Sequence, residues 1–242
     1  MKKLDYDAIA DYYDTVESND ESMENAIDVI LKRNGSNTVL DMSAGTGKQS
    51  IFLARKGYEV TANDINAKML GFAKKKATLS NLKIRFHVGN MCSINLGQFD
   101  AAISMYNSIG HLSTHEFREM LLNIHKHLNP NGVYIFDILD RKFAENELPK
   151  HELIGTAKAI GGMKLVIFIK YTLNGGMLRV FQRLIVQKGL EEMKEAKQSW
   201  DMRVYYKEEL EKLIVGAGFK VMADESRIWK SKGSNFIVAR KL

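Results

Sequence analysis

The stretch TVLDMSAGTGKQS, residues 38–50, decides the fold of the chain. Three β-branched or apolar residues lead into an acid, small residues and two glycines follow, and apolar residues then recur with helical spacing. This order predicts a strand, a tight turn and a helix whose first N–H groups have no partner within the helix. Glycine has no Cβ and lets the backbone approach a ligand closely. The stretch therefore predicts a loop that binds a nucleotide-type ligand.

Two well-known glycine-rich loops fit this stretch poorly. The phosphate-binding loop of NTPases needs Gly, four residues and Gly-Lys-Ser/Thr, whereas MSAGTGKQ at residues 42–49 fails at both ends of that pattern. The dinucleotide pattern G-x-G-x-x-G fits Gly45 and Gly47 but meets Ser50 at its third glycine, which weakens this interpretation without excluding it. Asp41, at the carboxyl end of the strand, would repel a pyrophosphate and attract a cation. A polyphosphate ligand is therefore disfavoured.

An acid, small residues and G-x-G together resemble motif I of the class I S-adenosyl-L-methionine (SAM) dependent methyltransferases. That motif reads Asp/Glu-x-Gly-x-Gly-x-Gly, and this chain has serine at the first glycine. An acid suits SAM, which carries an ammonium and a sulfonium. The resemblance implies that SAM, and its product S-adenosyl-L-homocysteine, bind through Asp41, Ser43, Ala44, Gly45 and Gly47.

Length and composition fit one α/β domain, alone or with a sizeable insertion. Of 242 residues, 45% are hydrophobic and 26% are charged, as is usual for soluble proteins. No apolar run reaches the roughly 18 residues of a membrane helix, and no signal-peptide core follows the start, so we expect a cytoplasmic protein without membrane contact. The single cysteine, Cys92, excludes an intramolecular disulfide. The net charge of +6 suits an anionic substrate without establishing nucleic-acid binding.

A second acid stands at the end of the next predicted strand, residues 58–63. Asp64 follows Gly45 by about 20 residues, the spacing at which such folds place an acid that accepts both ribose hydroxyls. NAD and SAM both contain adenosine, so this spacing does not separate them. The resemblance to the methyltransferases implies that Ile65 and Met69 of this chain line the adenine pocket.

The third predicted strand, residues 83–88, leads into Gly89-Asn90-Met91. The resembling family has Gly-Asp-Met here, with the acid accepting from the adenine amino group and the next residue lying on the ring. Asn90 departs from that pattern, but its amide oxygen can also accept a hydrogen bond. The resemblance therefore implies an adenine contact at Asn90 and Met91.

The loop MYNSIGHL, residues 105–112, follows the fourth predicted strand and combines aromatic, amide and imidazole groups. Open α/β sheets build their sites beyond the carboxyl ends of their strands. The loop resembles that of small-molecule N-methyltransferases such as glycine N-methyltransferase and sugar-amine dimethyltransferases. It lacks the Asn/Asp-Pro-Pro-Tyr/Phe signature of enzymes that methylate base amino groups, so nucleic acid is a disfavoured partner. We expect Met105 at the cofactor, His111 as the candidate base, and Tyr106 and Asn107 as polar aligners; a structural role for the histidine is the alternative.

Other histidines suggest no metal site. His111 and His115 lack a third ligand nearby, and His125 and His127 are expected on the solvated side of a helix. No Cys, His and carboxylate cluster has metal-ligand spacing, so we predict no metal.

The resemblance implies an α/β fold: a Rossmann-like seven-stranded methyltransferase sheet with helices on both faces and an antiparallel β insertion after strand five. The expected parts are an N-terminal cap and helix, a SAM-binding core, the insertion, and a helix with a β-hairpin that completes the core sheet: residues 1–37, 38–150, 151–205 and 206–242. Tyr12 and Tyr13 are expected in the cap over the cofactor, although they could equally pack the first helix. The insertion would be a substrate lid, a homodimer contact or a sheet extension.

The sequence thus predicts a SAM-dependent methyltransferase that acts on a small molecule, at an amine nitrogen, by direct in-line displacement. Alternatives on the same fold are an O-methyltransferase, an RNA or protein methyltransferase, and a module that binds SAM without catalysis. An NAD-linked oxidoreductase is disfavoured by Asp41, Ser50 and the C-terminal hairpin. The sequence does not identify the methyl acceptor.

Overall fold

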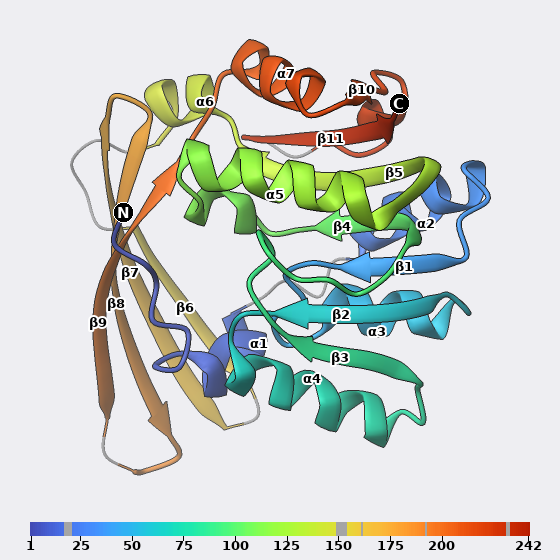
Figure 1. Ribbon diagram of the computed structural model, residues 1–242. Coiled ribbons are helices and arrows are strands. Elements are labelled where there is room, and N and C mark those ends of the chain that lie inside the picture. Colours follow the sequence, from blue (N-terminus) through green and yellow to red (C-terminus); the bar gives the residue numbers. More distant parts are fainter. Residues whose placement is uncertain (17–20, 149–153, 161, 192, 231–232) are drawn as a thin grey trace.

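Two β-sheets and the helices around them make up the computed structural model, which describes residues 1–16, 21–148, 154–160, 162–191, 193–230 and 233–242 (Figure 1). One sheet has seven strands in the order β10-β11-β5-β4-β1-β2-β3. The other has four antiparallel strands in the order β6-β7-β8-β9. Figure 1 shows the four-stranded sheet standing across the carboxyl ends of β1, β2 and β4.

The seven-stranded sheet has the predicted architecture. Its strands are β1 (Thr38–Asp41), β2 (Glu59–Asp64), β3 (Ile84–Val88), β4 (Phe99–Ser104), β5 (Leu128–Leu139), β10 (Phe219–Val221) and β11 (Ser234–Lys241). β11 runs antiparallel to both of its neighbours, β5 and β10, whereas the other described strand pairs of this sheet are parallel. β1 pairs with β2 on one side and β4 on the other, so the strand order reverses there. Open α/β sheets bind ligands at such a switch point.

Apolar residues alternate between the two faces of the sheet because successive side chains of a strand point in opposite directions. In β5, Tyr134 and Phe136 pack with α5 and α7, whereas Val133 and Ile135 pack with α2 and α3. α5 crosses in front of the sheet and α2 lies behind it (Figure 1). The core therefore consists of two apolar layers, one on each face of the sheet, and helices cover both faces as predicted.

The main helices are α2 (Ser22–Arg33), α3 (Lys48–Arg55), α4 (Ala67–Leu79), α5 (Thr114–His127) and α7 (Lys207–Gly216). The shorter ones are η1 (Ala10–Tyr12), α1 (Tyr13–Val16), η2 (Ser108–His111), α6 (Arg141–Asn146) and η3 (Glu225–Arg227). Asn66 caps α4 by accepting from the N–H of Met69 at 2.8 Å.

The four-stranded sheet forms the expected β insertion. Its strands are β6 (Ile154–Ile160), β7 (Met163–Asn174), β8 (Met177–Lys188) and β9 (Lys194–Arg203). Gly175 and Gly176, both at positive φ, join β7 to β8 in a hairpin. The expected boundary at 150/151 lies outside the described residues. The structure describes a single copy of the chain, so the homodimer stays a prediction.

One local expectation was wrong. His127 is not solvated: only 3% of it is exposed, and its Nε2 accepts from the backbone N–H of Leu96 at 3.0 Å. This partner is remote in sequence, so helical spacing could not reveal it.

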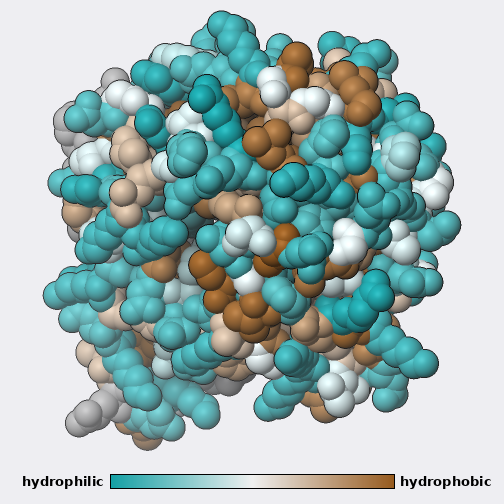
Figure 2. Space-filling view, in the orientation of Figure 1, coloured by the Kyte–Doolittle hydropathy of each residue, from teal (hydrophilic) through white to brown (hydrophobic). Residues whose placement is uncertain are grey.

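The N-terminal segment, residues 1–16, lies between the two sheets (Figure 1). Ile9 packs with Leu165, Ile167, Leu184 and Val186 of the four-stranded sheet. Figure 2 shows further hydrophobic residues gathered near the middle of this face, over the loops at the carboxyl ends of the strands. Among the described residues, none of the helices combines the length and apolar character that crossing a membrane requires.

Candidate active site

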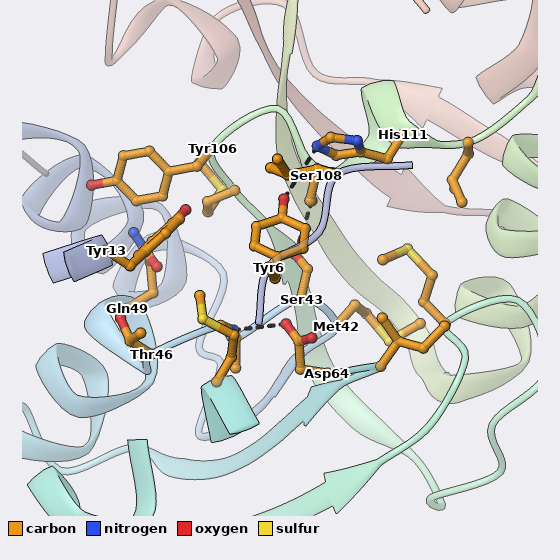
Figure 3. A pocket seen from close by; sticks show the side chains of 18 of the residues that line it. Tyr6, Tyr13, Met42, Ser43, Thr46, Gln49, Asp64, Tyr106, Ser108 and His111 are labelled. Atoms are coloured by element: carbon orange, nitrogen blue, oxygen red, sulfur yellow. Dashed lines mark hydrogen bonds between the residues drawn. The ribbon is translucent and has the colours of Figure 1, made fainter. Parts of the chain in front are cut away.

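A cavity opens at the carboxyl ends of β1, β2 and β4 and brings together most of the predicted site residues (Figure 3). The predicted residues on its wall are Tyr13, Ser43, Ala44, Gly45, Asp64, Ile65, Met69, Asn90, Met91, Met105, Tyr106 and His111. The wall also includes residues that were not predicted, among them Lys3, Leu4, Tyr6, Met42, Thr46, Lys48, Gln49, Ser108, Leu112 and Glu116. Asp41, Gly47, Asn107 and Tyr12 are not part of the wall.

Asp64 is the acid that this cavity presents. Its Oδ2 accepts from the backbone N–H of Gly45 at 2.8 Å, and its Oδ1 accepts from that of Asn66 at 2.8 Å. Burial raises the pKa of Asp64, and these backbone hydrogen bonds oppose the rise. Each carboxylate oxygen can accept a second hydrogen bond, so the pair can still receive two hydroxyls.

Gly45 brings the loop after β1 up to this acid. Its φ of 53° lies in the left-handed region, and a Cβ there would approach the Cε of Met69 to 3.7 Å. That contact is an ordinary one, so the positive φ is what favours glycine at this position. The turn itself closes through the N–H of Gly47, which donates to the carbonyl of Ala44 at 2.7 Å.

Asp41 lies behind the loop, which corrects its expected role as a direct partner for a cationic ligand. Its Oδ2 accepts from the hydroxyl of Ser50 at 2.6 Å, and its Oδ1 accepts from the N–H of Ser43 at 3.3 Å. Only 2% of the residue is exposed, and burial raises its pKa to about 7 against these hydrogen bonds. The carboxyl therefore holds the turn and the start of α3.

Gly47 also acts behind the wall. A Cβ at this position would lie 2.7 Å from the Cβ of Ala73 in α4, closer than real contacts allow. The glycine thus lets α3 and α4 pack together and does not contact the cavity.

Asn107 fastens the loop after β4 to β5 instead of facing the cavity. Its Oδ1 accepts from the N–H of Leu139 at 3.0 Å, and its own N–H donates to Asp137 at 3.2 Å. Asn107 and Tyr106 both have positive φ, at 56° and 58°, a conformation that costs energy in residues other than glycine. Burial raises the pKa of Asp137 to about 6 against the N–H groups of Asn107 and Tyr106. Asp137 therefore stabilises the strained loop.

Tyr106 reaches the cavity edge beside an ion pair between the partly buried Lys48 and the buried Glu24. Its hydroxyl lies 2.5 Å from the Nζ of Lys48 and 3.3 Å from the Oε1 of Glu24. Glu24 is 1% exposed and also accepts from Gln49 at 2.9 Å. Lys48 lies 3.5 Å from the same carboxylate, so the charge of the acid is compensated.

His111 faces the cavity and contacts Tyr6, which sequence analysis missed. The Tyr6 hydroxyl lies 3.2 Å from His111 Nε2, and the two rings meet edge to face (Figure 3). Burial lowers the pKa of His111 to about 4, with a further contribution from the charge of Lys3. The imidazole is therefore neutral at pH 7. The aromatic N-terminal segment was the signal for Tyr6, but the expectation named Tyr12 and Tyr13.

Among the described residues, no group of three His, Cys, Asp or Glu side chains is arranged to hold a metal ion.

Comparison with known families identifies the central part of the chain. A family model described as the methyltransferase domain matches residues 39–132. This part of the chain is a methyltransferase domain. It contains β1 to β4 and most of the cavity wall, whereas Tyr6, Tyr13 and Asp137 lie outside it.

Sequence relatives of the methyltransferase domain include N-methyltransferases. The chain is 38% identical over 103 residues, 41% of each chain, to YqeM of Bacillus subtilis (strain 168), a methyltransferase by provisional name. It is 27% identical over 186 residues to the dTDP-3-amino-3,6-dideoxy-alpha-D-glucopyranose N,N-dimethyltransferase of Streptomyces fradiae, covering 76% of this chain and 70% of that one. Glycine N-methyltransferases are also relatives, so the predicted resemblance is confirmed. In three of the curated relatives, the match spans 41%, 58% and 40% of the relative's length.

The structure around the methyltransferase domain matches a solved structure, that of an S-adenosylmethionine-dependent methyltransferase from Clostridium acetobutylicum ATCC 824. The TM-score is 0.81 at 18% identity, and the match covers 98% of this chain and 97% of that one. The chain therefore has the class I methyltransferase fold, which confirms the fold prediction.

Proposed function

We propose that the chain is a SAM-dependent methyltransferase that methylates a small molecule at an amine nitrogen. The observation that carries this proposal is the Asp64 carboxylate, which two backbone N–H groups hold at the cavity wall while its free lone pairs remain available. A ribose offers the two adjacent hydroxyls that such an acid can accept. The methyltransferase domain and the N-methyltransferase relatives support the same function.

The residues beside Asp64 fit the remainder of an adenosine. Ile65, Met69 and Met91 give the wall apolar side chains against which a purine ring can lie. The Oδ1 of Asn90 accepts from the N–H of Cys92 at 2.9 Å and keeps a second lone pair for an amino group. Because Asp41 is turned away, the cationic end of SAM would instead meet the loop backbone near Ser43 and Gly45.

Methyl transfer from SAM needs little acid–base catalysis from the residues of this site. SAM supplies a methyl group that its sulfonium has already activated. The chain has to hold the acceptor in line with that methyl group and exclude water, and such positioning can lower a barrier by roughly 7–11 kcal/mol. Tyr6, His111 and Tyr106 are among the polar groups at the wall that can position an acceptor.

The neutral histidine favours nitrogen over oxygen as the acceptor atom. With a pKa of about 4, His111 is a weak base at pH 7 and suits the role of a hydrogen-bond acceptor. A neutral amine can attack with its own lone pair, whereas an alcohol needs a base strong enough to take its proton. The O-methyltransferase alternative is therefore disfavoured.

Calorimetric titration with SAM tests the cofactor assignment. We expect Asp64→Ala to weaken SAM binding roughly 10-fold to 100-fold, because a hydrogen bond to a charged group contributes about 1.5–3 kcal/mol. Asp64→Asn should have an intermediate effect. Asp224→Asn, at a side chain that is 99% exposed, is the matched control. Unchanged SAM affinity in Asp64→Ala would remove the ribose assignment.

The acceptor can be found with methyl-labelled SAM and a metabolite extract, followed by mass spectrometry. A labelled amine supports the proposal, and a labelled alcohol or phenol would show that the acceptor atom is oxygen. SAM binding without any labelled product would indicate a non-catalytic module. Tight binding of NAD with no binding of SAM would replace the proposal by the oxidoreductase alternative.

A further inference from the structure

A second groove, separate from the cavity of the candidate active site, gathers positive charge on the outer side of α5. Four cationic side chains line it, each from a different element: Arg118 of α5, Arg141 of α6, Arg203 at the end of β9 and Lys212 of α7. Glu209 is the only acid among the described residues that line the groove. These elements meet in the upper left of Figure 1, where the turn between β7 and β8 closes one side.

Three of these cations, Arg118, Arg203 and Lys212, lack a partner among the residues that the structure describes. Within that part of the chain, no hydrogen bond or ion pair engages their side chains, and the buried Nε of Arg203 has no hydrogen-bond partner. Leaving a buried donor unsatisfied is unfavourable, and bringing like charges together adds to that cost. Both costs would fall if an anion occupied the groove.

Arg141 is held in place at the groove by contacts of its own. Its Nε donates to Glu145 at 2.9 Å, and its guanidinium lies 4.5 Å from the ring centre of Tyr206. A Cβ on Gly176 would approach its Nη1 to 3.1 Å, so the glycine turn leaves room for this arginine. The groove thus has one fixed guanidinium beside others that a ligand can engage.

Tyr205 lines the groove near the positive charges of Arg203 and Arg118. Burial raises the pKa of Tyr205, and the charges of Arg203 and Arg118 oppose that rise. The Tyr205 hydroxyl lies 3.3 Å from that of Thr114 at the start of α5. The cavity volume of about 680 Å³ lies within the usual range of small-molecule pockets.

The groove and the candidate active site are distinct. Of the residues that the structure describes, none lines both the groove and the cavity. The first turns of α5 stand between them, with Glu116 on the cavity side and Arg118 on the groove side. An anion in the groove therefore would not compete directly for the cavity.

We propose that this groove binds the phosphate group of a small molecule, with Arg118 and Arg203 donating to its oxygens and Lys212 and Arg141 adding charge. Four cations against one acid suit a dianion better than a single carboxylate. Guanidinium groups match phosphate oxygens in paired hydrogen bonds. The cations converge from four elements on one groove and do not form an extended stripe, which favours a compact ligand over a nucleic acid.

Calorimetric titration of the full chain with inorganic phosphate and with pyrophosphate tests the site at low ionic strength. We expect both to bind, and Arg203→Gln and Arg118→Gln each to weaken binding roughly tenfold or more, since each removes hydrogen bonds to a charged group. Arg203→Lys keeps the positive charge but loses the paired N–H donors of the guanidinium, so its phosphate affinity should lie between those of the wild type and Arg203→Gln. Arg33→Gln, which removes the same charge at an exposed position of α2, should stay within about twofold of the wild type.

Several outcomes would overturn the site. One is that the wild-type protein binds neither probe. Another is that Arg33→Gln weakens binding as much as Arg203→Gln, which would indicate diffuse surface charge. Binding of a single-stranded RNA oligomer without binding of either probe would point to a nucleic-acid surface.

Two further measurements keep these outcomes interpretable. Circular dichroism of each variant verifies folding. SAM affinity measured in the same variants should not change, so a failure of this site and a failure of the proposed methyltransferase remain distinguishable.

Discussion

At the scale of single residues, Asp41 is a carboxyl that the fold uses for structure. Both of its oxygens are engaged by Ser50 and Ser43, and neither reaches the cavity. The sequence could predict an acid at the end of the first strand, because the motif is local. It could not predict which way the side chain points, because that depends on how the turn closes against α3.

The burial of Asp41 predicts that the free energy of unfolding depends on pH. Burial raises its folded pKa to about 7, above the ordinary value of 3.8, so the native state binds more protons than the unfolded state between these values. Wild-type stability therefore falls as the pH rises through that window. Asp41→Asn lacks this charge. Between pH 5 and pH 8, we expect the free energy of unfolding of the wild type to fall by roughly 1–3 kcal/mol relative to Asp41→Asn, measured by urea denaturation.

Asp100 provides the matched control. Burial alone would raise its pKa, but hydrogen bonds from the N–H groups of Thr38 and Asn37 and from other donors hold it below the usual value. Asp100 is thus ionised in both states throughout pH 5–8, and the effect of Asp100→Asn should not change with pH there. A difference between Asp41→Asn and the wild type that is equally flat would show that Asp41 titrates normally.

At the scale of elements, the packing of α3 on α4 depends on Gly47. Its φ of 87° already disfavours other residues, and Ala73 leaves no room for a Cβ. Gly57 has a similar φ of 95°, but a Cβ there would meet nothing within 4 Å, so it isolates the backbone effect.

Paired glycine substitutions therefore separate strain from close packing. We expect Gly47→Ala to lower the free energy of unfolding by roughly 2–5 kcal/mol, from left-handed strain of about 1–2 kcal/mol and overpacking of about 1–3 kcal/mol. Gly57→Ala should cost only the strain. Urea denaturation of both variants measures the difference, and equal losses would show that α3 and α4 can move apart freely.

Elements were predictable where the signal is local. Asn66 as a cap and the glycine turn between β7 and β8 both follow from neighbouring residues. Ser113 caps α5 in a capping box with Glu116. The Ser-x-x-Glu spacing of such a box is also a local signal that the sequence contains.

At the scale of the whole molecule, the cavity depends on contacts between segments far apart in the chain. Tyr6 and Tyr13 come from the N-terminal segment, and His111 follows β4. The order of strands and the Asp64 spacing could be predicted because each is set within one βα unit. The placement of Tyr6 could not, because it depends on a sheet that begins more than a hundred residues later.

The four-stranded sheet should hold the N-terminal segment against the core. Leu165 is 1% exposed and packs in the apolar cluster that includes Ile9 and, at its edge, Tyr6 and Tyr13. Leu165→Ala would remove part of that cluster, and a buried Leu→Ala change costs about 2–5 kcal/mol. Opening of the segment should become easier, since about 1.4 kcal/mol of local stability corresponds to a tenfold change in the open population.

Hydrogen exchange followed by mass spectrometry measures this coupling without any ligand. In Leu165→Ala, we expect amides of residues 6–13 to exchange at least tenfold faster than in the wild type. Leu210→Ala, which empties an equally buried position in α7, is the control, and its exchange at residues 6–13 should stay near the wild-type rate at temperatures where the variant is folded. If both variants accelerate exchange equally, the segment opens only with global unfolding. Faster exchange in Leu165→Ala alone would mean that the four-stranded sheet determines how firmly Tyr6 and Tyr13 stay at the cavity. The sheet, which lies outside the methyltransferase domain, would then be coupled to the candidate active site.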